Sequence, residues 1–142
     1  MSIQEWVDAA ITADRAARLA QSDRLTLGEI IDKCEAIGGD ADVVFDFEYA
    51  IPRGLDSWRG VYAELALSFG FDHGEVMNLP EFVAMLKDAV GKSFYGYKGG
   101  EFTMSRRTPV WVANNGHSGN TAVIGVRDCG YQVVIETGYR ET

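Results

Sequence analysis

The stretch GYKGGEFTMSRR, Gly96–Arg107, gathers aromatic rings and cations around a glycine pair. Gly99 and Gly100 would let the backbone approach a phosphate closely, and neighbouring cations would neutralise its charge. The ring of Phe102 would offer a stacking face to a base, so the mixture fits a nucleotide better than a sugar or a lipid. The same residues also suit a hairpin with ordinary surface charge, and both interpretations stay open. The cations of the stretch are Lys98, Arg106 and Arg107.

A second segment, DSWRG at Asp56–Gly60, sets an arginine beside an indole ring. Arg59 could clamp a phosphate through paired N–H groups or stack on a base, with Trp58 supporting it. Alternatively, Trp58 packs on the edge of a sheet and Arg59 pairs with Asp56. These residue types suit binding and structure equally well.

The motifs of the common enzyme classes are missing from the sequence. Gly91–Ser93, GKS, resembles only the end of a phosphate-binding loop, because the earlier glycine is absent and a helix precedes it. His73 and His117 fall in separate loops, and Asp46 and Glu48 alternate with apolar residues as on the solvated face of a strand. We therefore expect a protein without catalytic residues, metal ligands or a cofactor.

Charge and composition limit the partners of the chain. It has 142 residues, 46% of them hydrophobic, a net charge of -8 and a pI near 4.7. Polymeric nucleic acid and anionic membrane surfaces attract basic proteins and are disfavoured, whereas a few converging cations would still hold a small phosphorylated ligand. Cys34 and Cys129 lack the spacing of a zinc or redox motif, which indicates reduced thiols in a cytosol. No signal peptide or membrane span is expected.

Three helices are expected from apolar periodicity and capping residues. The first is an amphipathic helix over Ile3–Leu19. A boundary near Ser22 separates residues 1–22, with a possible role in subunit contacts, from a ligand-binding domain of residues 23–142. The second opens with the capping-box pair Thr26 and Glu29 and closes at the glycines that follow. The third opens at Asn78 and Pro80 and ends before Gly91.

The remaining segments alternate as strands do. Val43–Glu48 and Gly60–Phe69 are expected to form a hairpin around a turn at Pro52 and Gly54. Five further strands follow, so the predicted fold is a single α+β domain with a mostly antiparallel sheet. These later strands are expected at Lys92–Tyr97, Glu101–Met104, Pro109–Ala113, Thr121–Arg127 and Tyr131–Thr137.

Two runs of the chain support a resemblance to a known family. FDFEYAIPRGLDSWRGVYAELAL, followed by a helix and then GYKGGEFTMSRRTPVWVAN, is similar to the first-described Thoeris anti-defence sponge family, which bacteriophages encode. The resemblance covers roughly Leu25 to Arg127. It implies a non-enzymatic protein in the cytoplasm of the infected bacterium, which sequesters cyclic ADP-ribose isomers, and in some members cyclic oligonucleotides, without cleaving them.

The resemblance also implies a symmetric homo-oligomer with ligand pockets at subunit contacts. Arg59 is the residue expected first for phosphate or base contact, with Trp58 beside it. Phe102 would stack on adenine, while Lys98 and Arg106 would meet phosphate. Two further candidates flank the second glycine-rich turn; they are Asn114 and Arg127.

Two other function classes stay open. An acidic surface could mimic nucleic acid and make the protein an inhibitor that binds a host defence protein directly, as anti-CRISPR proteins do. A small interaction module of a phage assembly is a further alternative, supported by the amphipathic first helix. Recovery of a cleaved nucleotide would instead indicate a phosphodiesterase or glycohydrolase.

Overall fold

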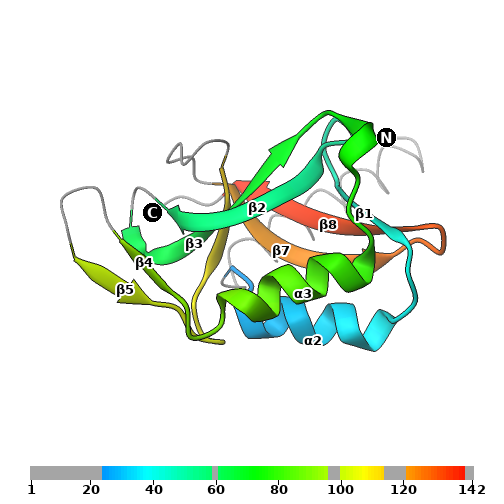
Figure 1. Ribbon diagram of the computed structural model, residues 1–142. Helices are drawn as coiled ribbons and strands as arrows, with labels where there is room; N and C mark the ends of the chain where they lie inside the picture. Colours follow the sequence, from blue (N-terminus) through cyan, green and yellow to red (C-terminus); the bar gives the residue numbers. More distant parts are fainter. Residues whose placement is uncertain (1–23, 59–60, 96–99, 114–120, 140–142) are drawn as a thin grey trace, which may run out of the picture.

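The chain folds into a mixed β-sheet with helices packed on one of its faces, as Figure 1 shows. This computed structural model describes residues 24–58, 61–95, 100–113 and 121–139. In chain order the elements are α2 (Leu27–Ile37), β1 (Asp42–Phe45), β2 (Ile51–Trp58), β3 (Val61–Gly70), the 3-10 turn η1 (His73–Glu75), α3 (Leu79–Ala89), β4 (Ser93–Tyr95), β5 (Glu101–Thr103), β6 (Val110–Val112), β7 (Thr121–Asp128) and β8 (Gln132–Tyr139).

The main sheet has six strands in the order β1, β8, β7, β6, β3, β2. The pairs β8/β7, β7/β6 and β3/β2 are antiparallel, whereas β1/β8 and β6/β3 are parallel. The short strands β4 and β5 form a separate antiparallel hairpin that contacts β2 and β3. The predicted α+β fold with a mostly antiparallel sheet is confirmed.

Both predicted helix starts within the described residues are confirmed, because their signals are local. The Thr26 hydroxyl accepts a hydrogen bond from the Glu29 amide at 3.3 Å, and the Glu29 carboxylate accepts one from the Thr26 amide at 3.0 Å. This reciprocal capping box opens α2. Asn78 caps α3 by accepting from the Glu81 amide at 3.0 Å, and Pro80 stands in the first turn, where its missing N–H removes no intrahelical bond.

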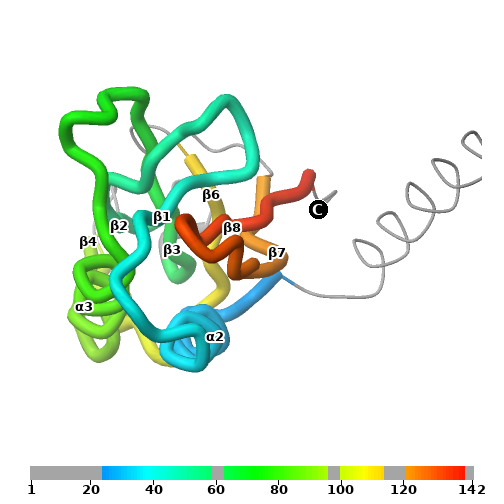
Figure 2. Tube along the Cα trace, turned by 90° about the vertical axis from the view of Figure 1, so that its right-hand side faces the viewer, coloured from blue at the N-terminus to red at the C-terminus, as the bar shows by residue number. Residues whose placement is uncertain are grey.

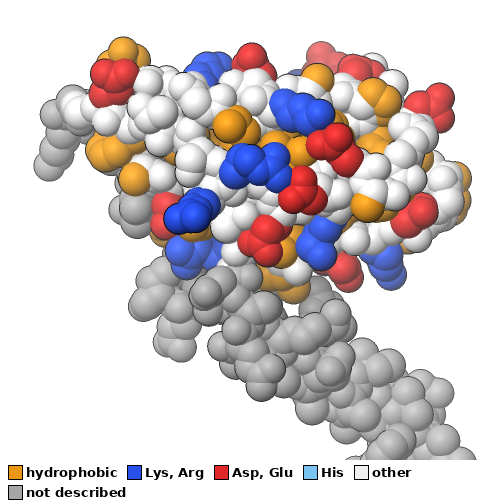
Figure 3. Space-filling model, turned by 90° about the horizontal axis from the view of Figure 1, so that it is seen from below, with side chains coloured by type: hydrophobic (Ala, Val, Ile, Leu, Met, Phe, Trp, Pro, Cys, Tyr) orange, Lys and Arg blue, Asp and Glu red, His pale blue; other side chains and the backbone are white. Residues whose placement is uncertain are grey.

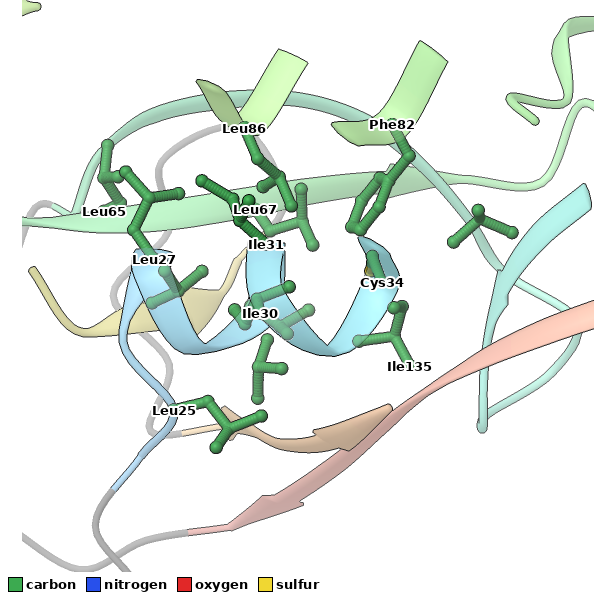
Figure 4. Close-up of a cluster of buried hydrophobic side chains, with 14 of the residues drawn as sticks. Leu25, Leu27, Ile30, Ile31, Cys34, Leu65, Leu67, Phe82, Leu86 and Ile135 are labelled. Carbon is green, nitrogen blue, oxygen red and sulfur yellow. The ribbon is translucent and has the colours of Figure 1, made fainter. Parts of the chain in front are cut away.

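Helices α2 and α3 lie side by side on one side of the sheet (Figure 2), and the space between them and the sheet holds the main hydrophobic core. Figure 4 shows side chains of both helices converging with Leu65 and Leu67 of β3 and Ile135 of β8. Full burial of such a side chain contributes about 1.5–3 kcal/mol, so this layer is the main stabilising contact of the fold. Its buried members from the helices are Leu27, Ile30, Ile31, Cys34, Leu79, Phe82, Leu86 and Ala89.

The sheet face that points away from the helices carries two smaller apolar clusters, because alternate residues of a strand face opposite sides. One of them, near the β1 edge, is formed by Val44, Ile51 and Val134. The other we call the tryptophan cluster; it consists of Trp58, Ala66, Trp111, Ala113 and Ala122.

The predicted first hairpin is wrong. Its expected strand at Val43–Glu48 ends at Phe45, as β1, and pairs in parallel with β8 rather than with Gly60–Phe69. The hairpin partner of β3 is β2, which contains Pro52 and Gly54, the residues expected in the turn. Because β2 is an edge strand, the missing N–H of Pro52 removes no required ladder bond, and the register shifts between these two residues.

The turn between β1 and β2 lies at residues 46–50 and contains no glycine. Glu48 and Tyr49 adopt left-handed φ angles of 50° and 54°, a conformation that costs a residue with a side chain about 1–2 kcal/mol. Two backbone bonds close the turn, from the Phe45 amide to the Ala50 carbonyl at 2.8 Å and from the Ala50 amide to the Phe47 carbonyl at 2.9 Å. No glycine or asparagine marks the left-handed positions, so the pattern indicated a longer strand.

The five later strands are confirmed as β4 to β8. The predicted first helix at Ile3–Leu19 and the boundary near Ser22 lie outside the described residues.

Candidate functional site

Three of the predicted ligand-binding residues, Arg59, Lys98 and Asn114, lie outside the described residues. The four that the structure describes are not brought into one pocket within a single chain. Trp58 belongs to the tryptophan cluster, and Arg127 lies elsewhere on the same sheet face. The other two, Phe102 and Arg106, lie on the helix side of the molecule.

Trp58 is stacked against another ring of the same chain. Its indole lies face to face with that of Trp111, with centroids 4.3 Å apart and planes inclined by 13°. Only 4% of Trp58 is exposed, so in this conformation its ring supports the sheet rather than facing a ligand. Trp58 directly precedes Arg59 in the chain, and Ala113 directly precedes Asn114. Trp58 and Ala113 both belong to the tryptophan cluster.

A polar group that sequence reasoning missed completes this cluster. The Arg24 guanidinium carbon lies 4.6 Å from the centroid of the Trp111 ring, within the range of a cation–π contact. Glu64 joins both residues, because it accepts a hydrogen bond from the Trp111 indole N–H at 2.6 Å and pairs with Arg24 at 3.3 Å. The three residues are far apart in the chain, so no local pattern could have connected them.

Arg106 is held against α2 by contacts that have no local sequence signal. Its guanidinium pairs with the Asp32 carboxylate at 2.6 Å and donates to the Gly28 carbonyl at 3.2 Å. A Cβ at position 28 would stand 2.8 Å from the Arg106 Cβ, so glycine is required for this close approach. The helix side is a face of interspersed cations and carboxylates (Figure 3), and Lys87 pairs there with Glu35 at 3.3 Å.

Phe102 lies in the predicted glycine-rich hairpin, which the structure describes as β4 and β5. It faces Phe94 across the two strands and is half-buried against the main core. Gly100 has a φ of 94°, and a Cβ there would lie 3.5 Å from the Phe102 ring. The described part of the stretch therefore agrees with the hairpin interpretation, since Glu101–Thr103 pairs with Ser93–Tyr95 and the Phe102 ring covers Gly100, whereas residues 96–99 lie outside the described residues.

Arg127 is a described candidate that lines a cavity. We call this cavity the Arg127 pocket; it has a volume of about 380 Å³ and lies beside the turn at residues 46–50. Its floor includes the apolar side chains of Val44 and Val134, while Arg127 is exposed and 73% of Tyr49 is exposed. The other lining residues are Phe45, Asp46, Glu48 and Gln132.

The polar groups around this pocket are ordered by the neighbouring strand. The Asp46 carboxylate accepts hydrogen bonds from the Thr137 amide at 2.9 Å and the Thr137 hydroxyl at 2.5 Å. Thr137 is only 7% exposed, so these bonds fix the start of the turn to β8. The pocket thus combines one cation, one open ring, an amide and carboxylates over an apolar floor.

Two other hollows fit an anionic ligand less well. A larger one of about 480 Å³ is lined by Asp40, Asp42 and Asp128, with no cation among its lining residues. Another of about 350 Å³ lies between α2 and α3 and reaches Cys34, and its lining cation, Lys87, is already paired with Glu35. Burial, with a smaller contribution from the charge of Glu35, raises the pKa of the Cys34 thiol from 9.0 to about 12, so this thiol is a poor nucleophile.

One of the two histidines lies in the described part of the chain. His73 is exposed in η1, whereas His117 lies outside the described part. Nowhere in residues 24–58, 61–95, 100–113 and 121–139 do three His, Cys, Asp or Glu side chains come close enough to share a metal ion. In the same ranges, every helix is too short or too polar to span a bilayer.

Comparison with known proteins adds no relative. No family model matches the chain, and neither a curated protein nor a solved structure shows significant similarity to it.

Proposed function

We propose that this protein binds a small nucleotide signal and holds it without cleaving it. The observation that carries the proposal is the Arg127 pocket, where an exposed cation and an exposed ring meet at a hollow of about 380 Å³. Cavities of about 300–1,000 Å³ are typical of small-ligand sites, and an apolar floor with a few polar groups is their usual lining.

Each lining group matches one part of a nucleotide. The Arg127 guanidinium suits a phosphate, for which it can supply paired N–H donors. The Tyr49 ring suits stacking on a base. The Glu48 carboxylate suits ribose hydroxyls, which acidic side chains commonly bind in dinucleotide sites. One cation beside carboxylates therefore fits a ligand that carries phosphates and ribose hydroxyls together.

The sponge-family resemblance of the sequence narrows this ligand class. We propose a cyclic ADP-ribose isomer as the signal, with cyclic oligonucleotides as further ligands, and the cytoplasm of an infected bacterium as the place of action. Sequestration requires tight binding, and a nanomolar dissociation constant corresponds to about 12 kcal/mol. An open hollow on one chain has too few walls for that, so the proposal includes a homo-oligomer in which a neighbouring subunit encloses the ligand.

Native mass spectrometry of the full chain tests the proposal. The panel contains cyclic ADP-ribose isomers, cyclic dinucleotides and cyclic trinucleotides, with linear ADP-ribose for comparison. We expect one ligand class to add its mass to an oligomer and to be recovered intact after the protein is heated. Arg127→Ala should abolish this capture, whereas Arg107→Ala, which removes another exposed arginine, should not.

Other outcomes decide between the remaining functions. A ligand recovered in cleaved form would replace the sponge with an enzyme. No mass addition from the whole panel would end the nucleotide proposal, and a host defence protein that co-purifies in stoichiometric amount would then favour the direct inhibitor. The variants Arg59→Ala, Lys98→Ala and Asn114→Ala extend the same measurement to the predicted residues outside the described part.

A further inference from the structure

Arg127 projects from the sheet in a neighbourhood of carboxylates. Its partner across β7 and β8 is Val134, and Glu136 stands two residues further along β8 on the same face (Figure 1 shows the two strands side by side). Diagonal neighbours of this kind lie within reach of long side chains. Asp46 and Glu48 line the same pocket from the turn. An ion pair with Arg127 would therefore be the ordinary outcome.

No such ion pair is present. Within the described residues, all ion pairs belong to other cations, and Arg127 takes part in none. Two of these three carboxylates, Glu136 and Asp46, are each held away from Arg127 by a different contact.

Glu136 is folded onto the backbone of β7 at Gly125, the residue directly opposite it. A Cβ at position 125 would stand 2.5 Å from the Glu136 Oε1 atom and 3.4 Å from its Cβ. The carboxylate therefore occupies the space that any other residue type would fill with its own side chain. The register of β7 shifts between Val123 and Gly125, next to this contact.

Asp46 is held by Thr137, which donates both its amide and its hydroxyl to the carboxylate. Both oxygens of Asp46 therefore already accept a hydrogen bond from β8. Gly125 of β7 thus makes room for the Glu136 carboxylate, while Thr137, the residue after Glu136 in β8, holds Asp46.

We propose that the sheet keeps Arg127 available to an anionic ligand group by holding Glu136 over Gly125 and Asp46 on Thr137. Gly125 and Glu136 are then positioning residues that set the preference of the Arg127 pocket for a phosphate-bearing ligand. This inference rests on the proposed function for its ligand, but the availability of Arg127 can be measured without one.

Gly125→Ala tests the inference. The new methyl group meets the far end of a flexible side chain, so Glu136 is displaced while the backbone stays in place. The freed carboxylate then pairs with Arg127. Gly125→Ala/Glu136→Gln is the matched control, because it keeps the same methyl group and removes the charge. Thermal unfolding of each full-length variant verifies that it is folded.

Two probes are used on these variants. Phenylglyoxal, which modifies accessible arginines, is followed at the Arg127 peptide by mass spectrometry, and inorganic pyrophosphate is titrated by calorimetry. We expect Gly125→Ala to slow the modification and to weaken pyrophosphate binding about fivefold. The ligand must then break an exposed ion pair, and such a pair usually contributes at most a factor of about this size. The double variant should recover both properties, and Glu136→Gln alone should bind at least as tightly as the parent protein.

Equal modification rates in the parent protein and Gly125→Ala would overturn the inference, as would a double variant as impaired as the single one. If the modification rates are as expected but the parent protein binds no pyrophosphate, the assignment of a phosphate-bearing ligand is overturned. If the modification rates and the pyrophosphate affinities are as expected but no cyclic nucleotide binds, the inference stands and the proposed function fails.

Discussion

The indole rings of Trp58 and Trp111 stack face to face, with their centroids 4.3 Å apart. Trp58 ends β2 and Trp111 lies in β6, and these strands are not neighbours because β3 runs between them. The pair therefore spans three strands on the sheet face away from the helices. Trp58 therefore has the structural role that was one of its two interpretations from the sequence, while its stacking partner Trp111 was not predicted.

Trp58→Ala should lower the free energy of unfolding by about 3–5 kcal/mol, because it removes a large buried ring and leaves a cavity beside Trp111. Urea denaturation measures the effect. Trp58→Phe, which keeps a ring, should lose clearly less. If Trp58→Ala were as stable as the parent protein but bound no nucleotide, a ligand role for Trp58 would be the better explanation.

Arg106→Ala should lower the free energy of unfolding by up to about 1 kcal/mol, because the Arg106–Asp32 pair is largely exposed. Arg107→Ala is the matched control: Arg107 is also exposed and makes no ion pair within the described residues, so its loss should leave stability unchanged. Denaturation of both variants under the same conditions checks this. Unchanged stability with lost nucleotide binding in Arg106→Ala would return Arg106 to the ligand site.

Thr137→Val should lower the free energy of unfolding by about 1–3 kcal/mol, because the Asp46 carboxylate loses a hydroxyl donor while the side-chain shape is kept. Hydrogen exchange should also become faster at the Ala50 amide, which closes the turn at residues 46–50. A double-mutant cycle with Asp46→Ala isolates the contact, because alanine removes both acceptor oxygens. Additive losses in that cycle would mean that the bond does not anchor the turn.

The raised pKa of the Cys34 thiol predicts how the free energy of unfolding changes at alkaline pH. Its pKa is raised from 9.0 to about 12 in the folded protein, so the unfolded chain releases the proton first. The resulting stability is fully present below pH 9 and is lost as the pH rises from about 9 towards 12. Cys34→Ala should flatten this decline in unfolding measured across pH 8.5–11, and an unchanged slope would contradict the assignment. In the native protein, iodoacetamide at pH 8 should label the half-buried Cys129 before Cys34.

Structural features that depend on residues close together in the chain could be predicted from the sequence. Features that depend on residues far apart in the chain could not. The helix starts at Thr26 and Asn78 depend on residues within a few positions and were predicted correctly. The strand containing Pro52 was missed, because only its place at the edge of the sheet makes a proline acceptable.

The same distinction between short-range and long-range contacts applies to the residues of the candidate site. Arg127 was predicted as a further candidate, and it lines a pocket. The partners of Arg106 lie in α2, far away in the chain, so nothing near Arg106 indicated that it was engaged. The contact between Gly125 and Glu136 depends on the register of the β7–β8 hairpin, which shifts between Val123 and Gly125, and the alternation of residue types does not reveal such a shift.

The parallel pairing of β1 with β8 has a consequence for how the protein is made. Asp42 of β1 aligns with Gln132 of β8, so an early strand finds its neighbour only near the other end of the described fold. While the ribosome is still translating the middle of the chain, α2 and α3 have no completed sheet to cover, and the β2–β3 hairpin lacks its neighbour β6. Pairings between distant segments form slowly, and unpaired strand edges attract other chains in the meantime. We expect the nascent protein to be most vulnerable to aggregation until residues 132–135 have left the exit tunnel.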